Sequence, residues 1–369
     1  MSGRPAPIAF FLPSLCGGGA ERVVMNLASG MAQRGVSVDL VLAAAEGPLL
    51  GQVPAAVRLI DLGGHRVLRS FGPLTRYLRH ERPRVLISSM SHANLVAVWA
   101  ARLAGGTVPV VATVHNTMSQ SAREQGRVAR ALWPVLLRLF YPWASSVVAV
   151  SHGAAEDLAR TARLPRERVR VIYNPVIDPA VVAASVTPPD HPWFVPGQPP
   201  VILGAGRLTE QKDFESLIRG FAEVARCRSA RLLILGEGER RASLEALVQE
   251  LGLAEHVQLP GFRDNVMAYM AASEVFVLSS RWEGLPTVLI EAMAAGTRVV
   301  ATDCPSGPRE ILQDGRLGIL VPVADPPALA SAILRALEAP EATVPSDALT
   351  PFTSGAAIDH YLSLIETVR

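Results

Sequence analysis

The stretch VFVLSSRWEGLPTVLIEAMAAGTRVVATD (275–303) carries the pattern that decides the fold. Its two ends, 275–280 and 298–303, are short apolar runs of the kind that forms strands covered on both faces. Between them, the apolar spacing predicts a helix from Thr287 to Ala295, which Gly296 ends. A strand, a helix and a second strand in this order predict parallel α/β structure.

The same alternation recurs along the 369 residues of the chain. Amphipathic stretches such as 20–35 and 213–227 separate short apolar runs. These runs predict further strands at 7–13, 37–43, 84–89, 109–114, 146–151, 200–206, 231–236 and 256–261. The repetition predicts a doubly wound α/β fold, in which ligands bind outside the carboxyl ends of the strands.

A proline-rich interval divides this pattern into two parts. Residues 178–200 contain seven prolines, which the interior of a strand or helix does not accept. We therefore predict a Rossmann-like N-terminal domain over 1–178, a linker over 179–199 and a Rossmann-like C-terminal domain over 200–350. The helical segment 351–369 is expected to pack back towards the N-terminal domain, and the two domains are expected to face each other across a central cleft.

The composition excludes several classes of protein. With 49% apolar and 18% charged residues, the chain is globular rather than disordered. Its three cysteines lie far apart without a C-x-x-C pair, which argues against a disulfide framework and a structural zinc site. The N-terminus lacks the layout of a secretory signal, and Arg102 interrupts the most apolar window, 95–114. These features favour a cytoplasmic protein without a membrane span.

The charges are distributed unevenly along the chain. Residues 1–180 carry 20 Arg and 10 Asp or Glu, a net charge of +10, whereas residues 181–369 carry 15 basic and 23 acidic residues, a net charge of −8. The segments 65–84 and 123–143 are rich in Arg, and the second also has Trp and Leu at helical spacing. Such a helix lies either on an anionic membrane or against a core with an Arg-rich outer side, and the sequence favours neither. No nucleic-acid motif occurs in these segments, so a nucleic-acid partner is not expected.

Two loops that follow predicted strands could bind an anion. Three successive glycines at 17–19 would let the backbone approach a phosphate closely, although a plain tight turn accounts for them equally well. Arg207 and Lys212 lie five residues apart in a loop that opens a helix, and Lys212 is the only lysine of the chain. A guanidinium and an ammonium group together suit a diphosphate. The alternative is two solvated surface charges.

Glu283 and Glu291 flank the predicted start of the helix at Thr287, where unpaired amides favour an anion. The pair could be a hydrolytic acid and base, a metal site or a device for binding sugar hydroxyls. A metal site would need further ligands, and the chain has no D-x-D sequence. The spacing fits an extended ligand best, with a diphosphate at the helix end and hydroxyl groups on each side. Arg281 could form an ion pair with either carboxylate.

Eight segments of the chain resemble, in the same order, those of retaining glycosyltransferases of family 4. They are GGGAERVVMNLASGMAQRG, VATVHN, AVSHGAAEDL, VIYNPV, GAGRLTEQKDFESLI, ILGEGERRASLE, VQLPGFRDNV and SRWEGLPTVLIEAMAAGTRVVATDCPSGPREIL. They span most of the chain, and the Glu-x7-Glu element of the last segment is specific. The resemblance implies a GT-B fold, in which two Rossmann-like doubly wound domains face a central cleft, and an enzyme that transfers a sugar.

The resemblance also implies the roles of particular residues. Arg207 and Lys212 would neutralise the donor diphosphate, Glu283 would hold hydroxyls of the transferred sugar, and Glu291 would bind the ribose. His115, otherwise expected to be a satisfied histidine at a strand end, would reach the transferred sugar. The other donor-binding positions that the resemblance implies are Gly18, Gly19, Phe262, Arg263, Gly284, Leu285, Pro286 and Thr287.

The expected reaction moves a hexose or N-acetylhexosamine from a nucleoside-diphosphate sugar to a hydroxyl group, with retention of configuration. Electrostatic stabilisation of the leaving diphosphate would drive it, without a metal or other cofactor. The runs at 174–176 and 307–310 resemble those of family members that use UDP-sugars more than those of members that use GDP-mannose, which implies a UDP-sugar donor. The acceptor is expected to be a glycan or a polyprenyl-linked chain of cell-surface polysaccharide or lipopolysaccharide, used at the inner face of the plasma membrane. A sugar-nucleotide epimerase, a nicotinamide-dependent oxidoreductase and a non-catalytic sugar-nucleotide binder are the alternatives.

Overall fold

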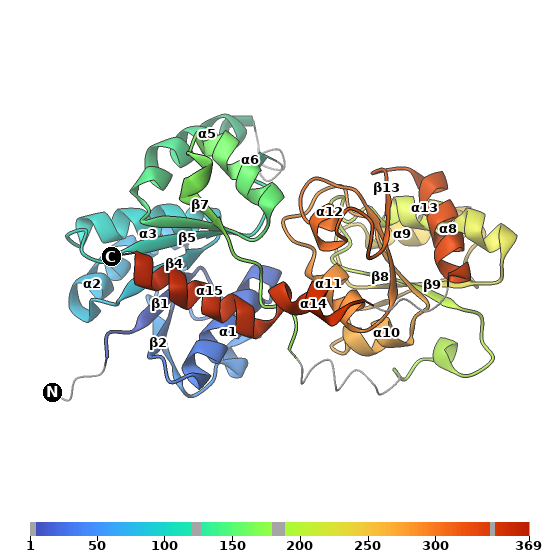
Figure 1. Cartoon of the computed structure of the whole chain (residues 1–369), viewed down its shortest axis with the longest axis horizontal. Helices are drawn as coiled ribbons and strands as arrows, with labels where there is room; N and C mark the ends of the chain where they lie inside the picture. Colours follow the sequence, from blue (N-terminus) through green and yellow to red (C-terminus); the bar gives the residue numbers. More distant parts are fainter. Residues whose placement is uncertain (1–4, 120–126, 179–188, 340–343, 369) are drawn as a thin grey trace. The chain divides into compact units, whose positions relative to one another are not determined.

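The computed structural model describes residues 5–119, 127–178, 189–339 and 344–368, without the side chains of 127–131 and 346, and it divides into two compact units (Figure 1). Unit 1 comprises Met1–Pro175 together with Phe352–Arg369, and unit 2 comprises Val176–Pro351. Residues 179–188 of the predicted linker lie outside the described residues. The rest of that segment contains a single turn, η5 (Pro192–Phe194).

In its described part, unit 1 contains a parallel sheet of seven strands in the order β3-β2-β1-β4-β5-β6-β7. The strands are β1 (Ile8–Leu12), β2 (Val38–Leu42), β3 (Val57–Asp61), β4 (Val85–Ser89), β5 (Val110–Val114), β6 (Ser146–Ala149) and β7 (Val169–Val171). All the strands predicted for this part of the chain are present. The sequence did not predict β3 or β7, because β3 alternates between apolar and polar residues and β7 has only three residues.

Helices connect the strands of unit 1 and cover both faces of its sheet (Figure 1). They are α1 (Gly19–Gln33), α2 (Phe71–Glu81), α3 (Ser91–Leu103), α5 (Arg127–Phe140), α6 (His152–Ala162) and α15 (Ser354–Thr367), with the short turns η1 (Leu50–Gln52), η2 (Val67–Ser70), η3 (Tyr141–Trp143) and η4 (Arg166–Arg168). Successive residues of β1 point to opposite faces. Ala9 and Phe11 pack with α2, α3 and α6, whereas Ile8 and Phe10 pack with α1 and α15.

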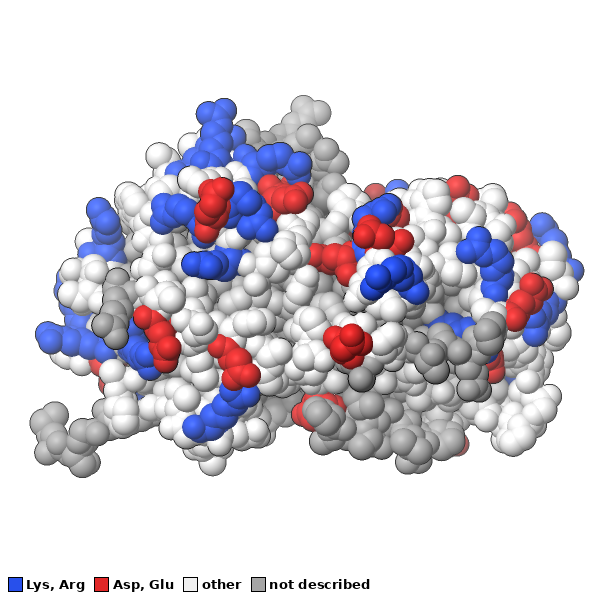
Figure 2. All heavy atoms as spheres, viewed as in Figure 1, with Lys and Arg blue, Asp and Glu red and all other residues white. Residues whose placement is uncertain are grey.

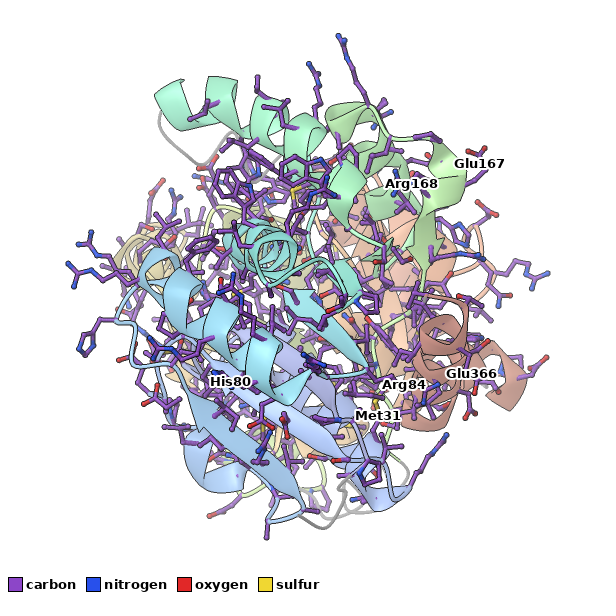
Figure 3. All side chains as sticks on the ribbon, turned by 90° about the vertical axis from the view of Figure 1, so that its left-hand side faces the viewer. Met31, His80, Arg84, Glu167, Arg168 and Glu366 are labelled. Atoms are coloured by element: carbon purple, nitrogen blue, oxygen red, sulfur yellow. The ribbon has the colours of Figure 1, made fainter. Side chains whose placement is uncertain are left out.

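The C-terminal helix α15 is part of unit 1 although it lies far from the rest of this unit in the sequence. Met31 of α1, labelled in Figure 3, belongs to the same buried cluster as Ile358 and Tyr361 of α15. A Cβ atom on Gly30 of α1 would lie 2.4 Å from the Cδ1 atom of Ile358. The missing side chain of Gly30 therefore lets α1 and α15 approach each other closely.

The described part of unit 2 contains a parallel sheet of six strands in the order β10-β9-β8-β11-β12-β13. The strands are β8 (Val201–Ala205), β9 (Arg231–Leu235), β10 (Val257–Gly261), β11 (Val275–Leu278), β12 (Arg298–Thr302) and β13 (Ile319–Val321). The helices are α8 (Phe214–Cys227), α9 (Arg241–Glu250), α10 (Val266–Ala272), α11 (Thr287–Ala294), α12 (Pro308–Ile311), α13 (Pro326–Glu338) and α14 (Ser346–Leu349), and the turn η6 (Thr350–Phe352) follows them. Only the three-residue strand β13 was not predicted.

Each sheet reverses its strand order at one point. In unit 1 this point lies between β1 and β4, and in unit 2 it lies between β8 and β11. The loops that leave two such neighbouring strands diverge to opposite faces, so a crevice opens at the carboxyl ends of the strands. The loops that follow β1, β8 and β11 contain most of the predicted site residues. None of the described helices is long and apolar enough to cross a membrane.

Candidate functional site

Lys212 lies in the loop between β8 and α8, close to the backbone of the strand end. A Cβ atom on Gly206 would lie 3.3 Å from the Cε atom of Lys212. The absent side chain therefore leaves space for the methylene groups of the lysine. The Nζ atom of Lys212 donates a hydrogen bond of 2.6 Å to Oε1 of Glu283, which follows β11. The structure thus brings together two residues that lie 71 positions apart in the sequence.

Glu283 is a buried carboxylate that has only part of its hydrogen-bonding capacity in use. Its side chain is 6% exposed, and that of Lys212 is 17% exposed. The Oε1 atom accepts hydrogen bonds from Lys212 and from the hydroxyl of Ser280, each 2.6 Å long. Among the described residues, no other group bonds to Oε2 of Glu283 or to Nζ of Lys212. An ammonium group has three donors, so the pair can still bind both an anion and a hydroxyl group.

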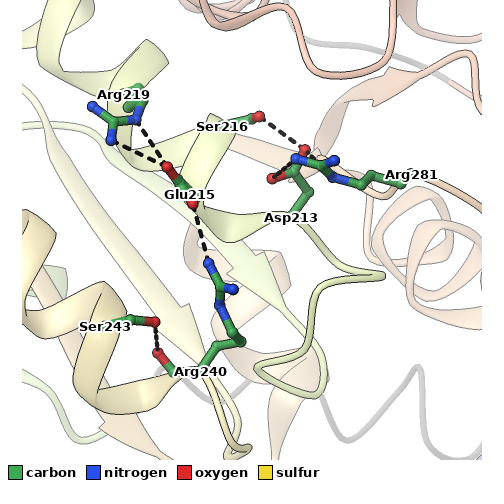
Figure 4. Close-up of polar contacts among 7 residues, drawn as sticks. All are labelled: Asp213, Glu215, Ser216, Arg219, Arg240, Ser243 and Arg281. Carbon is green, nitrogen blue, oxygen red and sulfur yellow. Dashed lines mark hydrogen bonds and ion pairs between the residues drawn. The ribbon is translucent and has the colours of Figure 1, made fainter. Parts of the chain in front are cut away.

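A second ion pair joins the same two loops, as Figure 4 shows. Asp213 follows Lys212, and Arg281 precedes Glu283 by two residues. The Nε atom of Arg281 lies 3.0 Å from Oδ2 of Asp213, and the same oxygen accepts a 2.8 Å hydrogen bond from Ser216. The structure therefore gives Arg281 a partner, Asp213, that differs from the expected glutamates. Asp213 has a left-handed backbone with φ of 46°, a conformation that costs energy outside glycine and is held here by these contacts.

Backbone contacts fix the loop that leads into α11. The hydroxyl of Ser306 donates to the carbonyl of Gly284 at 2.9 Å, and the amide of Glu283 donates to the carbonyl of Pro305 at 3.3 Å. A Cβ atom on Gly307 would lie 2.4 Å from Cδ of Pro286, so this contact requires glycine. Helix α11 begins at Thr287, as the sequence predicted, four residues after Glu283, and the first amides of a helix have no partner within it.

The other predicted donor-binding residues of unit 2 lie at different exposures. Leu285 is buried beside the start of α11, whereas Glu291 is partly buried on that helix. Arg207 is exposed just after β8. Phe262 and Arg263 follow β10, which lies two strands from β8 in the sheet, and Phe262 is exposed. Phe262 and Arg263 thus lie in a loop two strands away from the loop of Lys212. No described contact joins either residue to the Lys212–Glu283 pair.

In unit 1, the glycine loop after β1 leads directly into α1. The amide of Gly18 donates a 2.5 Å hydrogen bond to the carboxylate of Glu21, so this amide is already engaged. This contact was not predicted, although an acidic residue three positions after a helix cap is a recognisable signal of it. Gly19 is exposed, and a Cβ atom placed on it would meet no atom within 4 Å. The space beside Gly19 is therefore open to a ligand.

His115 follows β5 in unit 1 and is not the satisfied histidine that its position alone would suggest. Its Nε2 atom lies 3.2 Å from the hydroxyl oxygen of Thr113, whereas its buried Nδ1 atom has no hydrogen-bond partner within the described residues. Burial lowers the pKa of His115 to about 4, so the ring is neutral near pH 7. A buried ring nitrogen without a partner is a group that a ligand can use.

We expect the stability of the protein to depend on pH through His115. The unfolded chain takes up this proton near pH 6.5, but the folded chain excludes it down to about pH 4. The stability that His115 contributes is thus complete above pH 6.5 and is lost as the pH falls towards 4, by up to about 3 kcal/mol. Urea denaturation at several pH values should show a smaller acid-induced loss in His115→Gln than in the parent protein. Equal losses would contradict the buried, neutral state.

Two profiles of protein families match the chain. The profile described as Glycosyltransferase Family 4 matches residues 17–178, and the one described as Glycosyl transferases group 1 matches residues 199–339. Together they extend over most of both units.

Individual relatives and solved structures agree with the profiles. An N-acetylgalactosamine-N,N'-diacetylbacillosaminyl-diphospho-undecaprenol 4-alpha-N-acetylgalactosaminyltransferase of Campylobacter jejuni is 29% identical over 86% of each chain. The lipopolysaccharide core biosynthesis glycosyltransferase LpsE of Rhizobium meliloti is 29% identical over 86% of this chain and 84% of its own. The structure of HepE of Anabaena in complex with UDP superposes with a TM-score of 0.76 at 22% identity and covers 98% of this chain and 100% of HepE. Sucrose-phosphate synthase of Thermosynechococcus elongatus gives a TM-score of 0.78 at 21% identity, over 98% and 99% of the two chains.

The profiles cover both parallel α/β units, and the solved structures share their architecture over nearly the whole chain. The chain therefore belongs to glycosyltransferase family 4 and has the GT-B fold, built from two Rossmann-like units.

Proposed function

We propose that the protein transfers a hexose or N-acetylhexosamine from a UDP-sugar to a hydroxyl group of a glycan or polyprenyl-linked acceptor, with retention of configuration and without a metal ion. The observation that carries this proposal is the Lys212–Glu283 pair at the point where the strand order of unit 2 reverses. This pair combines a cation for phosphate with an acceptor for hydroxyl groups. Such a combination suits a sugar nucleotide.

The geometry of the pair supports a division of roles. Two donors of the Lys212 ammonium group remain for oxygens of the diphosphate, and the amides at the start of α11 add positive potential beside it. The Oε2 atom of Glu283 remains for a hydroxyl group of the transferred sugar. Arg207, which is exposed after β8, would add a second cation. These fixed charges would take the part of a divalent metal in neutralising the leaving group.

The proposed reaction needs no strong base among the residues of the site. The bond between the anomeric carbon and the diphosphate oxygen breaks, and the acceptor oxygen forms the new bond on the same face of the sugar. The proton of the acceptor hydroxyl passes to the departing phosphate oxygen. Because negative charge grows on the diphosphate, the contacts of Lys212 and of the α11 amides strengthen in the transition state. The residues of this chain would therefore act by binding, orientation and charge stabilisation.

The proposed donor and acceptor come from the similar proteins. HepE was solved with UDP and also with UDP-glucose, and the name of the Campylobacter relative describes a sugar chain on diphospho-undecaprenol. The name of LpsE places that relative in lipopolysaccharide core synthesis. By analogy, we propose a role in cell-surface polysaccharide or lipopolysaccharide synthesis at the inner face of the plasma membrane. The Arg-rich N-terminal unit would then lie near lipid.

A panel of nucleotides tests this proposal. UDP and UDP-sugars should raise the melting temperature of the protein in the presence of EDTA, because a ligand at a hundred times its Kd stabilises a protein by about 2.7 kcal/mol. GDP-mannose should have a smaller effect. NMR of the product formed with the active donor and a polyprenyl-linked acceptor should show the anomeric configuration of the donor. Stabilisation only by GDP-sugars, a strict need for divalent metal, or an inverted product would contradict the corresponding part of the proposal.

A further inference from the structure

Unit 1 exposes a group of large apolar side chains on three neighbouring elements. Among the described residues, ten large apolar side chains are exposed, and six of them lie on α3, α5 and η3 with exposed fractions of 44% to 56%. We call these six the apolar surface: Trp99, Leu103, Leu132, Val135, Leu139 and Trp143. Single exposed apolar residues are ordinary, but a group of this kind indicates a surface that meets another apolar phase.

The members of the apolar surface on α5 share one face of that helix. Leu132, Val135 and Leu139 are spaced by three and four residues, which places them on the same side. Leu137, on another side of α5, is fully buried in the core of unit 1. Helix α5 is therefore apolar towards the core and also towards solvent along this stripe.

Aromatic contacts join the three elements into one continuous surface. The ring centroid of Phe140 lies 5.1 Å from that of Trp99 on α3 and 5.2 Å from that of Trp143 on η3. The Trp99 ring also contacts Phe71 at the start of α2, with a centroid distance of 6.3 Å. The exposed Trp rings are thus held by edge-to-face contacts rather than extending freely into solvent.

Arginine side chains support the same surface. The guanidinium carbon of Arg102 lies 5.1 Å from the ring centroid of Trp143. Arg168, labelled in Figure 3, donates to the carbonyl groups of Pro142 and Ala144 at 3.2 and 3.1 Å, which fixes the turn that carries Trp143. One cationic group, that of Arg102, therefore lies beside the Trp143 ring, and Arg168 holds the turn that carries this ring.

The charge of this region is complementary to an anionic partner. From Arg82 to Ala155, both included, the sequence contains seven arginines and a single acidic residue, Glu124; Arg123 and Glu124 lie outside the described residues. Helices α3 and α5 and the turn η3 carry no Asp or Glu at all. Figure 2 shows many Arg side chains, with some Asp and Glu among them, over the face of unit 1 that it draws. The combination of exposed Trp and Leu with Arg and without carboxylates suits the interface of an anionic bilayer, where Trp lies at the headgroups and Arg binds phosphate.

We propose that the apolar surface of α3, α5 and η3 docks unit 1 on an anionic lipid bilayer. The side chains of Leu132, Val135 and Leu139 enter the boundary between headgroups and acyl chains, while Trp99 and Trp143 lie at the headgroup level. Docking of this kind holds the enzyme where a lipid-linked acceptor resides. The inference rests on the proposed function only for the nature of that acceptor, because binding to lipid requires no turnover.

Vesicle binding by the full-length chain tests the inference. The protein is sedimented with vesicles of phosphatidylcholine alone and with vesicles that also contain phosphatidylglycerol, at low and high salt. Leu139→Glu and Val135→Glu place a charge in the apolar surface. Val195→Glu is the matched control, because Val195 is 54% exposed but lies in unit 2. Melting temperatures and the stabilisation by UDP are measured for each variant to verify that it is folded.

The parent protein should sediment with the anionic vesicles, and salt should weaken this binding because the electrostatic part is screened. Leu139→Glu and Val135→Glu should each lower the partition coefficient about tenfold, whereas Val195→Glu should leave it unchanged. Absence of binding by the parent protein, or equal loss in all three variants, would overturn the inference. So would a parent dimer that Leu139→Glu converts to a monomer, since the surface would then join two copies. Vesicle binding without any response to nucleotides would instead contradict the proposed function and leave this inference standing.

Discussion

Replacing Lys212 by alanine is expected to lower kcat by about 10² to 10³, with a smaller change in the KM for the donor. The removal of one preorganised charge contact to a developing anion has an effect of this size. Lys212 is the cation that the structure holds at the reversal point of the sheet, and two of its donors have no partner among the described residues. Initial rates with a saturating acceptor over a range of donor concentrations measure both constants. Near-normal turnover would refute the role of Lys212 in stabilising the leaving group.

The Lys212 variant needs a control for stability, because the ion pair is largely buried. Truncation of one partner of a buried pair leaves an uncompensated charge and typically costs about 3–5 kcal/mol of folding free energy. Lys212→Ala is therefore expected to unfold at lower urea concentration than the parent. Combining it with Glu283→Gln removes the stranded charge and should recover most of the stability but none of the turnover. Recovery of both properties would show that Lys212 acts only by holding the fold.

Adding side chains at Gly19 is expected to block the donor without disturbing the fold. An atom at the Cβ position of Gly19 meets nothing within 4 Å apart from the adjoining backbone, so the first atom of an added side chain has open space around it. If the start of α1 contacts the donor phosphate, as the family resemblance implies, the added atoms occupy the place of the ligand. We expect donor kcat/KM to fall progressively with the size of the side chain, by about 10² for Gly19→Leu, since a displacement of about 1 Å can cost this much. The rates are compared with melting temperatures of the same variants.

Gly72 supplies the matched control for this series. It is also an exposed glycine in the first turn of a helix of unit 1, α2, and a Cβ atom on it would meet no residue within 4 Å apart from its chain neighbours. Gly72→Ala and Gly72→Leu should leave the rates unchanged. They should lower the melting temperature, because Pro73 follows and disfavours a helical backbone at a residue that carries a Cβ atom. Unaltered rates in the Gly19 series would remove Gly19 from the donor site. Equal losses at Gly72 would show that the effect comes from the helix termini and not from a bound phosphate.

Patterns of apolar and turn-forming residues were sufficient to predict most of the strands and the start of α11. Most of the predicted strands are runs of apolar residues buried on both faces, so the hydrophobic pattern alone locates them, whereas the edge strand β10 is partly exposed. The start of α11 at Thr287 was also predictable, because Gly-Leu-Pro precedes an apolar periodic run. The strands β3, β7 and β13 were not predicted, because they lack such a local signal. They are short or partly exposed at the sheet edges, and pairing with a neighbouring strand decides them rather than their own composition.

Local sequence patterns alone were enough to predict the alternation of strands and helices and the positions of Lys212 and Glu283 in loops after strands. These features follow from hydrophobic periodicity and from residue types that act within a few positions. The pairing of Lys212 with the buried Glu283 and of Arg281 with Asp213 became evident only in the folded chain, as did the choice of α1 as the helix of the N-terminal unit on which α15 packs. Each of these contacts joins residues tens to hundreds of positions apart. They form because the strand order of a parallel sheet brings distant loops to one edge, and no local pattern records that order.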